Sequence, residues 1–132
     1  MILPIVTLSE ANGILSKTRF YKNGKPKPEH WTEKHDRHKK QKRAIFYALS
    51  PLINHVQLPC LITLKRYGPK FLDKHDNLPI SFKWILDQVC DMLIPGKKPG
   101  EADNDERIEI KYDQEKSKEY KVQIKIEWSI QS

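Results

Sequence analysis

This chain of 132 residues has no apolar stretch long enough to cross a bilayer. A membrane-spanning helix needs about 20 consecutive apolar residues, and no run approaches that length. Residues 1–6 lack the basic start of a signal peptide and are too short for one, so we expect an edge strand there. The sequence therefore predicts a folded domain with no spanning segment.

Cysteine is also scarce, with only Cys60 and Cys90. We expect both to be buried free thiols in a reducing compartment, with a disulfide as the alternative. Zinc binding is not expected, because His35 and His38 have no further Cys or His pair to complete a ligand set. A Gly-rich phosphate loop and a Ser-His-Asp arrangement are missing too.

Acidic residues are few in the first half of the chain. Residues 11–50 hold eleven Lys or Arg against three Asp or Glu, a net charge of +8, whereas the whole chain carries +7. Such one-sided charge favours a nucleic-acid partner. The alternatives are an anionic membrane surface and a basic face that is merely solvated.

The hydrophobic pattern predicts an α+β fold in one domain, with the order β-α-β-α-β-β. We expect a four-stranded mixed sheet with two helices packed on one face. Within the domain of residues 1–132, the expected segments are a basic loop (11–30), a basic helix (31–53), a strand (58–65), an acidic turn with a helix (72–94) and a hairpin (106–130).

Two short acidic segments interrupt the basic chain. Asp73 and Asp76 precede the second predicted helix, and Asp103 and Asp105 precede the predicted hairpin. Carboxylates packed close together repel one another unless a cation lies among them. We therefore expect these four to converge on Mg²⁺, which would neutralise a scissile phosphate and help to generate the attacking hydroxide. Lys83 would contact the same phosphate or the leaving oxygen.

Each of these residues also has a simpler interpretation. Asp76 or Asn77 can cap the following helix. Residues 103–105 can be an ordinary polar turn, and Lys83 can pair with Asp87 in solvent. Only their joint occurrence favours a metal site.

The basic helix and the loop before it carry the expected DNA contacts. Basic side chains would bind phosphates, and an aromatic side chain would stack on bases or wedge between them. No base-reading motif is visible, so DNA shape rather than sequence would be recognised. The expected contacts are Arg19, Phe20, Lys34, Arg37, His38, Lys39, Lys40, Lys42 and Arg43.

Three motifs resemble the RusA family of Holliday junction resolvases, and phage RusA-like proteins in particular. They are Leu72-Asp73-x-x-Asp76-Asn77-Leu78, Lys83 with Asp87, and Gly100-x-x-Asp103-x-Asp105-x-Arg107-Ile108. The likeness covers roughly residues 28–128. It implies a homodimeric endonuclease, dependent on Mg²⁺ or Mn²⁺, that nicks branched DNA in recombination and repair. The implied setting is the cytoplasm of a bacterial or phage-infected cell, with no membrane partner.

The resemblance also implies roles for single residues. Asp76 matches the aspartate before Asn-Leu, Lys83 matches the helix lysine, and either Asp103 or Asp105 matches the late acid. The family's usual partner acid lies two residues before Asp76, where this chain has Lys74, so Asp73 is the nearest substitute. We therefore expect Asp73, Asp76 and Lys83 to be catalytic. A non-catalytic DNA-binding accessory protein on the same fold is the alternative.

Overall fold

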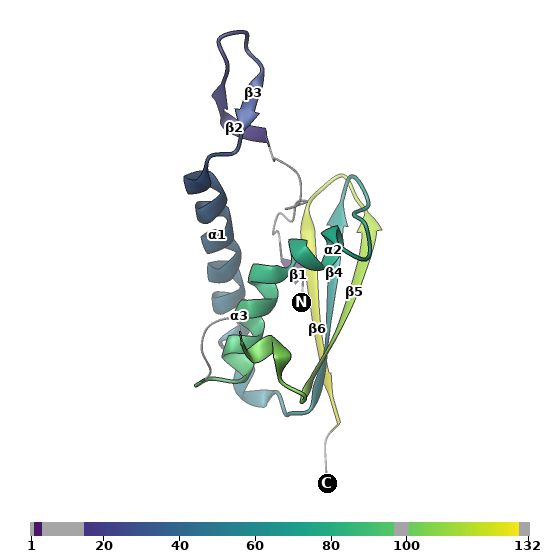
Figure 1. Ribbon diagram of the computed structural model, residues 1–132. Helices are drawn as coiled ribbons and strands as arrows, with labels where there is room; N and C mark the ends of the chain where they lie inside the picture. Colours follow the sequence, from purple (N-terminus) through teal and green to yellow (C-terminus); the bar gives the residue numbers. More distant parts are fainter. Residues whose placement is uncertain (1, 4–14, 97–100, 130–132) are drawn as a thin grey trace.

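The computed structural model describes residues 2–3, 15–96 and 101–129 (Figure 1). Of the first expected strand, only residues 2–3 are therefore described. In chain order the elements are β1 (Ile2–Leu3), β2 (Leu15–Phe20), β3 (Pro26–Pro28), α1 (Trp31–Leu49), η1 (Ile53–His55), β4 (Cys60–Gly68), α2 (Asn77–Ser81), α3 (Lys83–Leu93), η2 (Ala102–Asn104), β5 (Ile108–Lys116) and β6 (Lys121–Trp128).

Three long strands form the main sheet, with β4 at its centre. β4 runs parallel to β5 and antiparallel to β6, so Cys60 lies opposite both Ile108 and Trp128. The two-residue β1 adds to the free side of β6, and β2 and β3 make a separate antiparallel pair. Figure 1 shows α1 and α3 together on one face of the main sheet.

The expected single sheet with two helices is wrong. Residues 15–28 form a second, two-stranded sheet instead of part of a loop, and the described chain has three α-helices. The lysines and prolines of this segment hid the strands, because neither strand has an alternating apolar pattern. Within residues 72–94, where a turn and one helix are expected, the helical part begins at Asn77 and is divided into two helices at Phe82. The Phe82 ring is fully buried beside Tyr112.

The expected hairpin at residues 106–130 is also wrong. β5 and β6 are consecutive strands, yet each pairs with β4 and neither pairs with the other. Alternating apolar residues identify a strand but do not identify its partner. The first helix ends at Leu49 rather than Ile53, because Pro51 has no N–H group with which to continue it.

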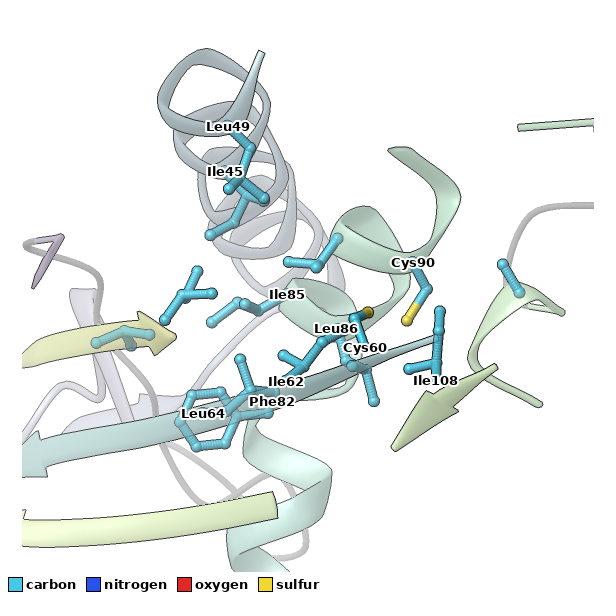
Figure 2. Packing of buried hydrophobic residues seen from close by; sticks show 14 of the residues in the cluster. Ile45, Leu49, Cys60, Ile62, Leu64, Phe82, Ile85, Leu86, Cys90 and Ile108 are labelled. Carbon is cyan, nitrogen blue, oxygen red and sulfur yellow. The ribbon is translucent and has the colours of Figure 1, made fainter. Parts of the chain in front are cut away.

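The core lies between the sheet and the two long helices. Phe82 and α3 together bury the apolar stripe expected from the sequence, and Phe82, Ile85 and Val89 have no exposed surface. Figure 2 shows this stripe beside the apolar side chains of β4 and of the C-terminal half of α1. Each fully buried large side chain stabilises the fold by about 1.5–3 kcal/mol.

Both cysteines lie in this core as free thiols (Figure 2). Cys60 is on β4 and Cys90 is on α3. Burial raises the pKa of the Cys60 thiol, because an apolar environment disfavours the charged thiolate. At any given pH the reactive thiolate is therefore less populated in the folded state than in the unfolded chain.

We expect Phe82→Ala to lower the free energy of unfolding by about 3–5 kcal/mol, because it leaves a cavity in the core. Urea unfolding followed by circular dichroism measures this change. Leu52→Ala is the matched control: Leu52 is 49% exposed, and its loss should cost less than about 1 kcal/mol. Equal losses for the two variants would contradict this account of the core.

The two thiols should react slowly with a thiol reagent near pH 8 in the native state and rapidly in urea. Burial blocks access to both sulfur atoms, and the raised pKa of Cys60 removes thiolate. Release of the coloured thiolate of Ellman's reagent follows the reaction. Immediate reaction of both groups without denaturant would show that this part of the core is open.

Candidate nucleic-acid interface

The hairpin of β2 and β3 projects beyond the N-terminal end of α1 (Figure 1). Its turn is closed by backbone hydrogen bonds from Tyr21 N–H to Lys25 O (2.8 Å) and from Gly24 N–H to Tyr21 O (2.9 Å). Gly24 has φ of 84°, a conformation that glycine adopts without a steric penalty. Asn23 Oδ1 accepts a further hydrogen bond from Lys25 N–H at 3.0 Å. These bonds give the tip a defined shape.

This hairpin carries charge of one sign together with exposed aromatic rings. Residues 15–28 contain five Lys or Arg and no Asp or Glu. Phe20 and Tyr21 are 52% and 50% exposed at the tip, and the Lys27 ammonium lies 5.5 Å from the centre of the Tyr21 ring. Arg19 Nη1 donates to Pro28 O across the two strands at 3.4 Å. The tip can therefore offer both phosphate contacts and a ring that stacks on bases.

Helix α1 continues the basic surface from the hairpin. His30 caps its N-terminus, with Nδ1 accepting from Thr32 N–H at 3.3 Å. The inner side of the helix buries four residues, His38, Gln41, Ile45 and Leu49. The exposed side carries one acidic residue, Asp36, among several basic and aromatic ones, and Lys42 is half-buried. The exposed basic and aromatic residues in the first part of the helix are Trp31, Lys34, His35, Lys39, Lys40 and Arg43.

Two of the expected DNA contacts on α1, Arg37 and His38, are largely buried and do not belong to its exposed side. The His38 ring is only 8% exposed and stacks on the Trp84 ring of α3, with centroids 3.4 Å apart. The Arg37 guanidinium is bound by the Glu29 carboxylate, Nη2 to Oε1 at 3.2 Å, and its side chain is 13% exposed. Helical spacing alone could not show this, because the inner side of α1 begins with polar residues.

The structure adds candidates that the sequence interpretation missed. Phe46 and Tyr47 are 50% and 69% exposed on the outer side of α1. Their sequence positions could have indicated this exposure, because both residues fall outside the apolar stripe of this helix. Lys22 and Lys25 in the turn of the hairpin are exposed as well.

The first acidic segment forms the turn before α2. Asp73 Oδ1 accepts from His75 N–H at 3.2 Å, and Asp73 O accepts from Leu78 N–H at 2.8 Å. Asp76 occupies the position before α2, but its side chain makes no capping hydrogen bond. Both carboxylates are exposed, as is Lys83 at the start of α3. The Lys83 ammonium lies 5.7 Å from the centre of the Trp84 ring.

The second acidic segment is held by an arginine. Asp105 accepts from Arg107 Nε and Nη2, both at 3.0 Å, and from the Arg107 backbone N–H at 2.9 Å. The hydrogen bond and charge of Asp105 raise the pKa of Arg107 further. The carboxylate is thus already matched by a cation. The side chain of Asp103 lies outside the described part of the chain.

The fold does not bring these two segments together. The side-chain amide of Gln114 bonds both the N–H and the C=O of Leu72, each at 2.9 Å, and so places Asp73 near the end of β5. Asp105 instead precedes the start of β5 at Ile108. The six-residue step from Ile108 to Gln114 spans about 20 Å at about 3.3 Å per residue. Figure 1 shows α2 and the start of β5 at opposite ends of the sheet.

Of the four carboxylates expected to converge, Asp73 and Asp76 therefore do not meet Asp105 within one chain, and the side chain of Asp103 is outside the described residues. Among residues 2–3, 15–96 and 101–129, no three His, Cys, Asp or Glu side chains are grouped so that they could hold a metal. The described residues of a single chain therefore do not fit Mg²⁺. Its role as cofactor stays a prediction from the sequence.

Comparisons with known protein families, with curated proteins and with solved structures find no match to this chain. The likeness to the RusA family thus depends on the motifs quoted above. Within the described residues, no helix combines the length and the apolar character needed to cross a membrane.

We expect Lys40→Ala to weaken binding to duplex DNA and to make the slope of log K against log salt shallower by about 0.9. That change corresponds to the loss of one phosphate contact on the outer side of α1. Fluorescence anisotropy at several salt concentrations measures it. Lys118→Ala, an exposed lysine between β5 and β6, removes the same charge and should leave the slope unchanged. Equal effects of the two variants would indicate that only net charge matters.

Proposed function

We propose that this protein binds branched DNA through the hairpin β2–β3 and the exposed side of α1, and cuts it as an Mg²⁺-dependent endonuclease. The observation that carries the binding is the gathering of exposed basic side chains and aromatic rings on the hairpin and on α1. The cutting is supported by the likeness of the two acidic segments to the RusA family. The proposed setting is recombination and repair in the cytoplasm of a bacterial or phage-infected cell.

Shape supports DNA as the ligand as much as charge does. The 19 residues of α1 span about 28 Å at about 1.5 Å per residue, and the hairpin extends the surface further. A basic surface of this length can follow several successive phosphates. Such contacts fix position without reading bases, so the selectivity would come from DNA shape.

The tip of the hairpin supports a branched substrate. Phe20 and Tyr21 expose half of their surface on an element that stands clear of the core. Bases in an intact duplex are already stacked, whereas a branch point can offer base faces to a neighbouring ring. The aromatic tip therefore fits a discontinuity in the helix better than a continuous duplex.

The chain's own residues have a limited part in the proposed cleavage. Lys83 is exposed next to α2 and would bind a phosphate as a point charge. Asp73 and Asp76 are exposed on the preceding turn. We assign no step through Mg²⁺, because Asp73 and Asp76 lie far from Asp105 within one chain.

A non-catalytic DNA-binding accessory protein is the second candidate. It is favoured by the separation of Asp73 from Asp105 across the sheet and by the pairing of Asp105 with Arg107. Both candidates use the same basic surface. Only the endonuclease requires a metal.

A synthetic four-way junction distinguishes the two candidates. We expect the protein to nick it in Mg²⁺ and not in EDTA, and Asp76→Asn to lower the rate by more than about 100-fold while leaving binding intact. Denaturing gels follow cleavage, and anisotropy in EDTA follows binding. Asp91→Asn on α3 makes the same chemical change away from the acidic turn and should retain the rate.

Two outcomes would change the assignment. Tight binding without nicking in either Mg²⁺ or Mn²⁺ would establish the accessory protein instead. Nicking by Asp76→Asn at the wild-type rate would remove Asp76 from the catalytic set.

A further inference from the structure

Two exposed aromatic rings contact each other on the outer side of α1, near its C-terminal end. Phe46 is 50% exposed and Tyr47 is 69% exposed, and the two rings meet edge to face with centroids 5.7 Å apart. Apolar area stabilises a fold only when it leaves water, so rings this exposed contribute little to folding. The pair is therefore available to a ligand.

The core holds the backbone that carries these rings. Ile45 and Leu49, on the inner side of the same helix, are buried and fix this turn against the core. Ser50 closes the end of the helix, because its N–H and its Oγ both donate to Phe46 O, at 3.0 Å and 2.6 Å. Each ring has only two side-chain torsions left to order. A site of this kind loses little conformational entropy when a ligand binds.

A row of basic side chains leads to the rings along the exposed side of α1. Its members are spaced four residues apart, so each adjoins the next on the helix surface. They are His35, Lys39 and Arg43, all exposed, followed by Tyr47. Arg43 also lies three residues before Phe46 and therefore adjoins both rings. The row rises by about 6 Å from one member to the next.

The acidic residue on this side of α1 lies away from the rings. Asp36 is ten residues before Phe46, or about 15 Å along the helix axis. Lys39 and Lys40 adjoin it, three and four residues further on, and partly offset its charge. Within α1 the rings are therefore flanked by a cation, Arg43, rather than by an anion.

An unpaired DNA strand has the two features that this surface would recognise. Its phosphates carry regularly spaced negative charge, and its bases expose faces that a duplex keeps stacked on one another. Proteins that bind single strands without reading their sequence combine basic side chains with aromatic rings in this manner. Arg43 can contact a phosphate while the neighbouring Tyr47 ring stacks on a base.

We propose that Phe46 and Tyr47 form a stacking site for the bases of an unpaired DNA strand, whose phosphates Lys39 and Arg43 bind. The preferred branched substrate then carries a single-stranded arm. The hairpin tip and this stacking site lie at opposite ends of α1, so they can bind different parts of one branched molecule (Figure 1). The inference rests on the proposed binding of DNA and not on the proposed cleavage.

An acidic segment of another protein is the competing ligand, since it too carries negative charge and can carry apolar side chains. Such a segment would contact the apolar surface of the rings, which a leucine would largely preserve. A stacked base instead requires a flat aromatic face. Tyr47→Leu therefore separates the two ligands.

Binding of a single-stranded oligothymidine, followed by fluorescence anisotropy, tests the stacking site. We expect the wild type to bind it about tenfold more tightly than an abasic strand of the same length, because the phosphates are equal and only stacking differs. Tyr47→Leu should lose most of this preference, and Tyr47→Trp should keep it. The slope of log K against log salt should not change in Tyr47→Leu, because no phosphate contact is removed.

Tyr67→Leu is the matched control. Tyr67 is half-buried on β4, on the face of the sheet that the helices leave uncovered, so this variant should keep the preference for the oligothymidine. Circular dichroism of every variant confirms that it is folded.

A DNA fork with one unpaired arm tests the substrate. We expect the wild type to bind it about tenfold more tightly than the same fork with that arm paired, and the double variant of Phe46→Leu with Tyr47→Leu to bind both forks alike. Equal binding of the two forks by the wild type would overturn the assignment of the substrate.

The remaining outcomes separate this inference from the proposed function. A wild type that binds the paired fork but does not prefer the oligothymidine to the abasic strand would overturn the stacking site and leave the proposed function standing. Full retention of that preference by Tyr47→Leu would do the same. A wild type that binds neither fork would overturn both the site and the proposed binding of DNA.

Discussion

The packing of α1 on α3 determines which charges of this protein reach solvent. Ile45 and Leu49 anchor one end of α1 in the core, and the His38 ring on Trp84 anchors the middle. These three contacts fix one side of α1 against the core. Because successive residues of a helix are rotated by about 100°, Lys39, Lys40 and Arg43 then lie on the solvent-exposed side. A helix bearing so many bases has weak amphipathic character of its own, so this contact with α3 orients it. The basic surface is a consequence of core packing rather than of the basic sequence alone.

The central strand β4 sets the positions of the acidic segments in a comparable way. At its end, Arg66 is 2% exposed and donates through Nη1 to Lys70 O at 2.7 Å. Burial lowers the pKa of Arg66, and a buried guanidinium needs such acceptors. Gly68 makes room for it, because a Cβ atom there would lie 2.7 Å from Arg66 Nη2. Together with Gln114, this arginine fixes the chain that leads to Asp73.

The sequence predicts the elements of this fold better than their partners. The buried stripe of α3 and the apolar strand β4 follow directly from spacing. The pairing of β5 with β4 does not, and it decides where Asp73 and Asp105 lie. In a parallel β-α-β unit the helix starts at the end of the first strand, and the chain then returns to the start of the second. Acids before the helix and acids before the second strand therefore lie at opposite ends. The inward turn of His38 could not be predicted either, because it depends on the ring of Trp84.

The exposed aromatic rings of the hairpin β2–β3 lie beyond the N-terminal end of α1 (Figure 1). In the proposed function, phosphate contacts along α1 would position the protein on a duplex arm, and the rings would then reach the point where that arm ends. Recognition of a branch would require no contact with a particular base, which agrees with the lack of a base-reading motif in this chain.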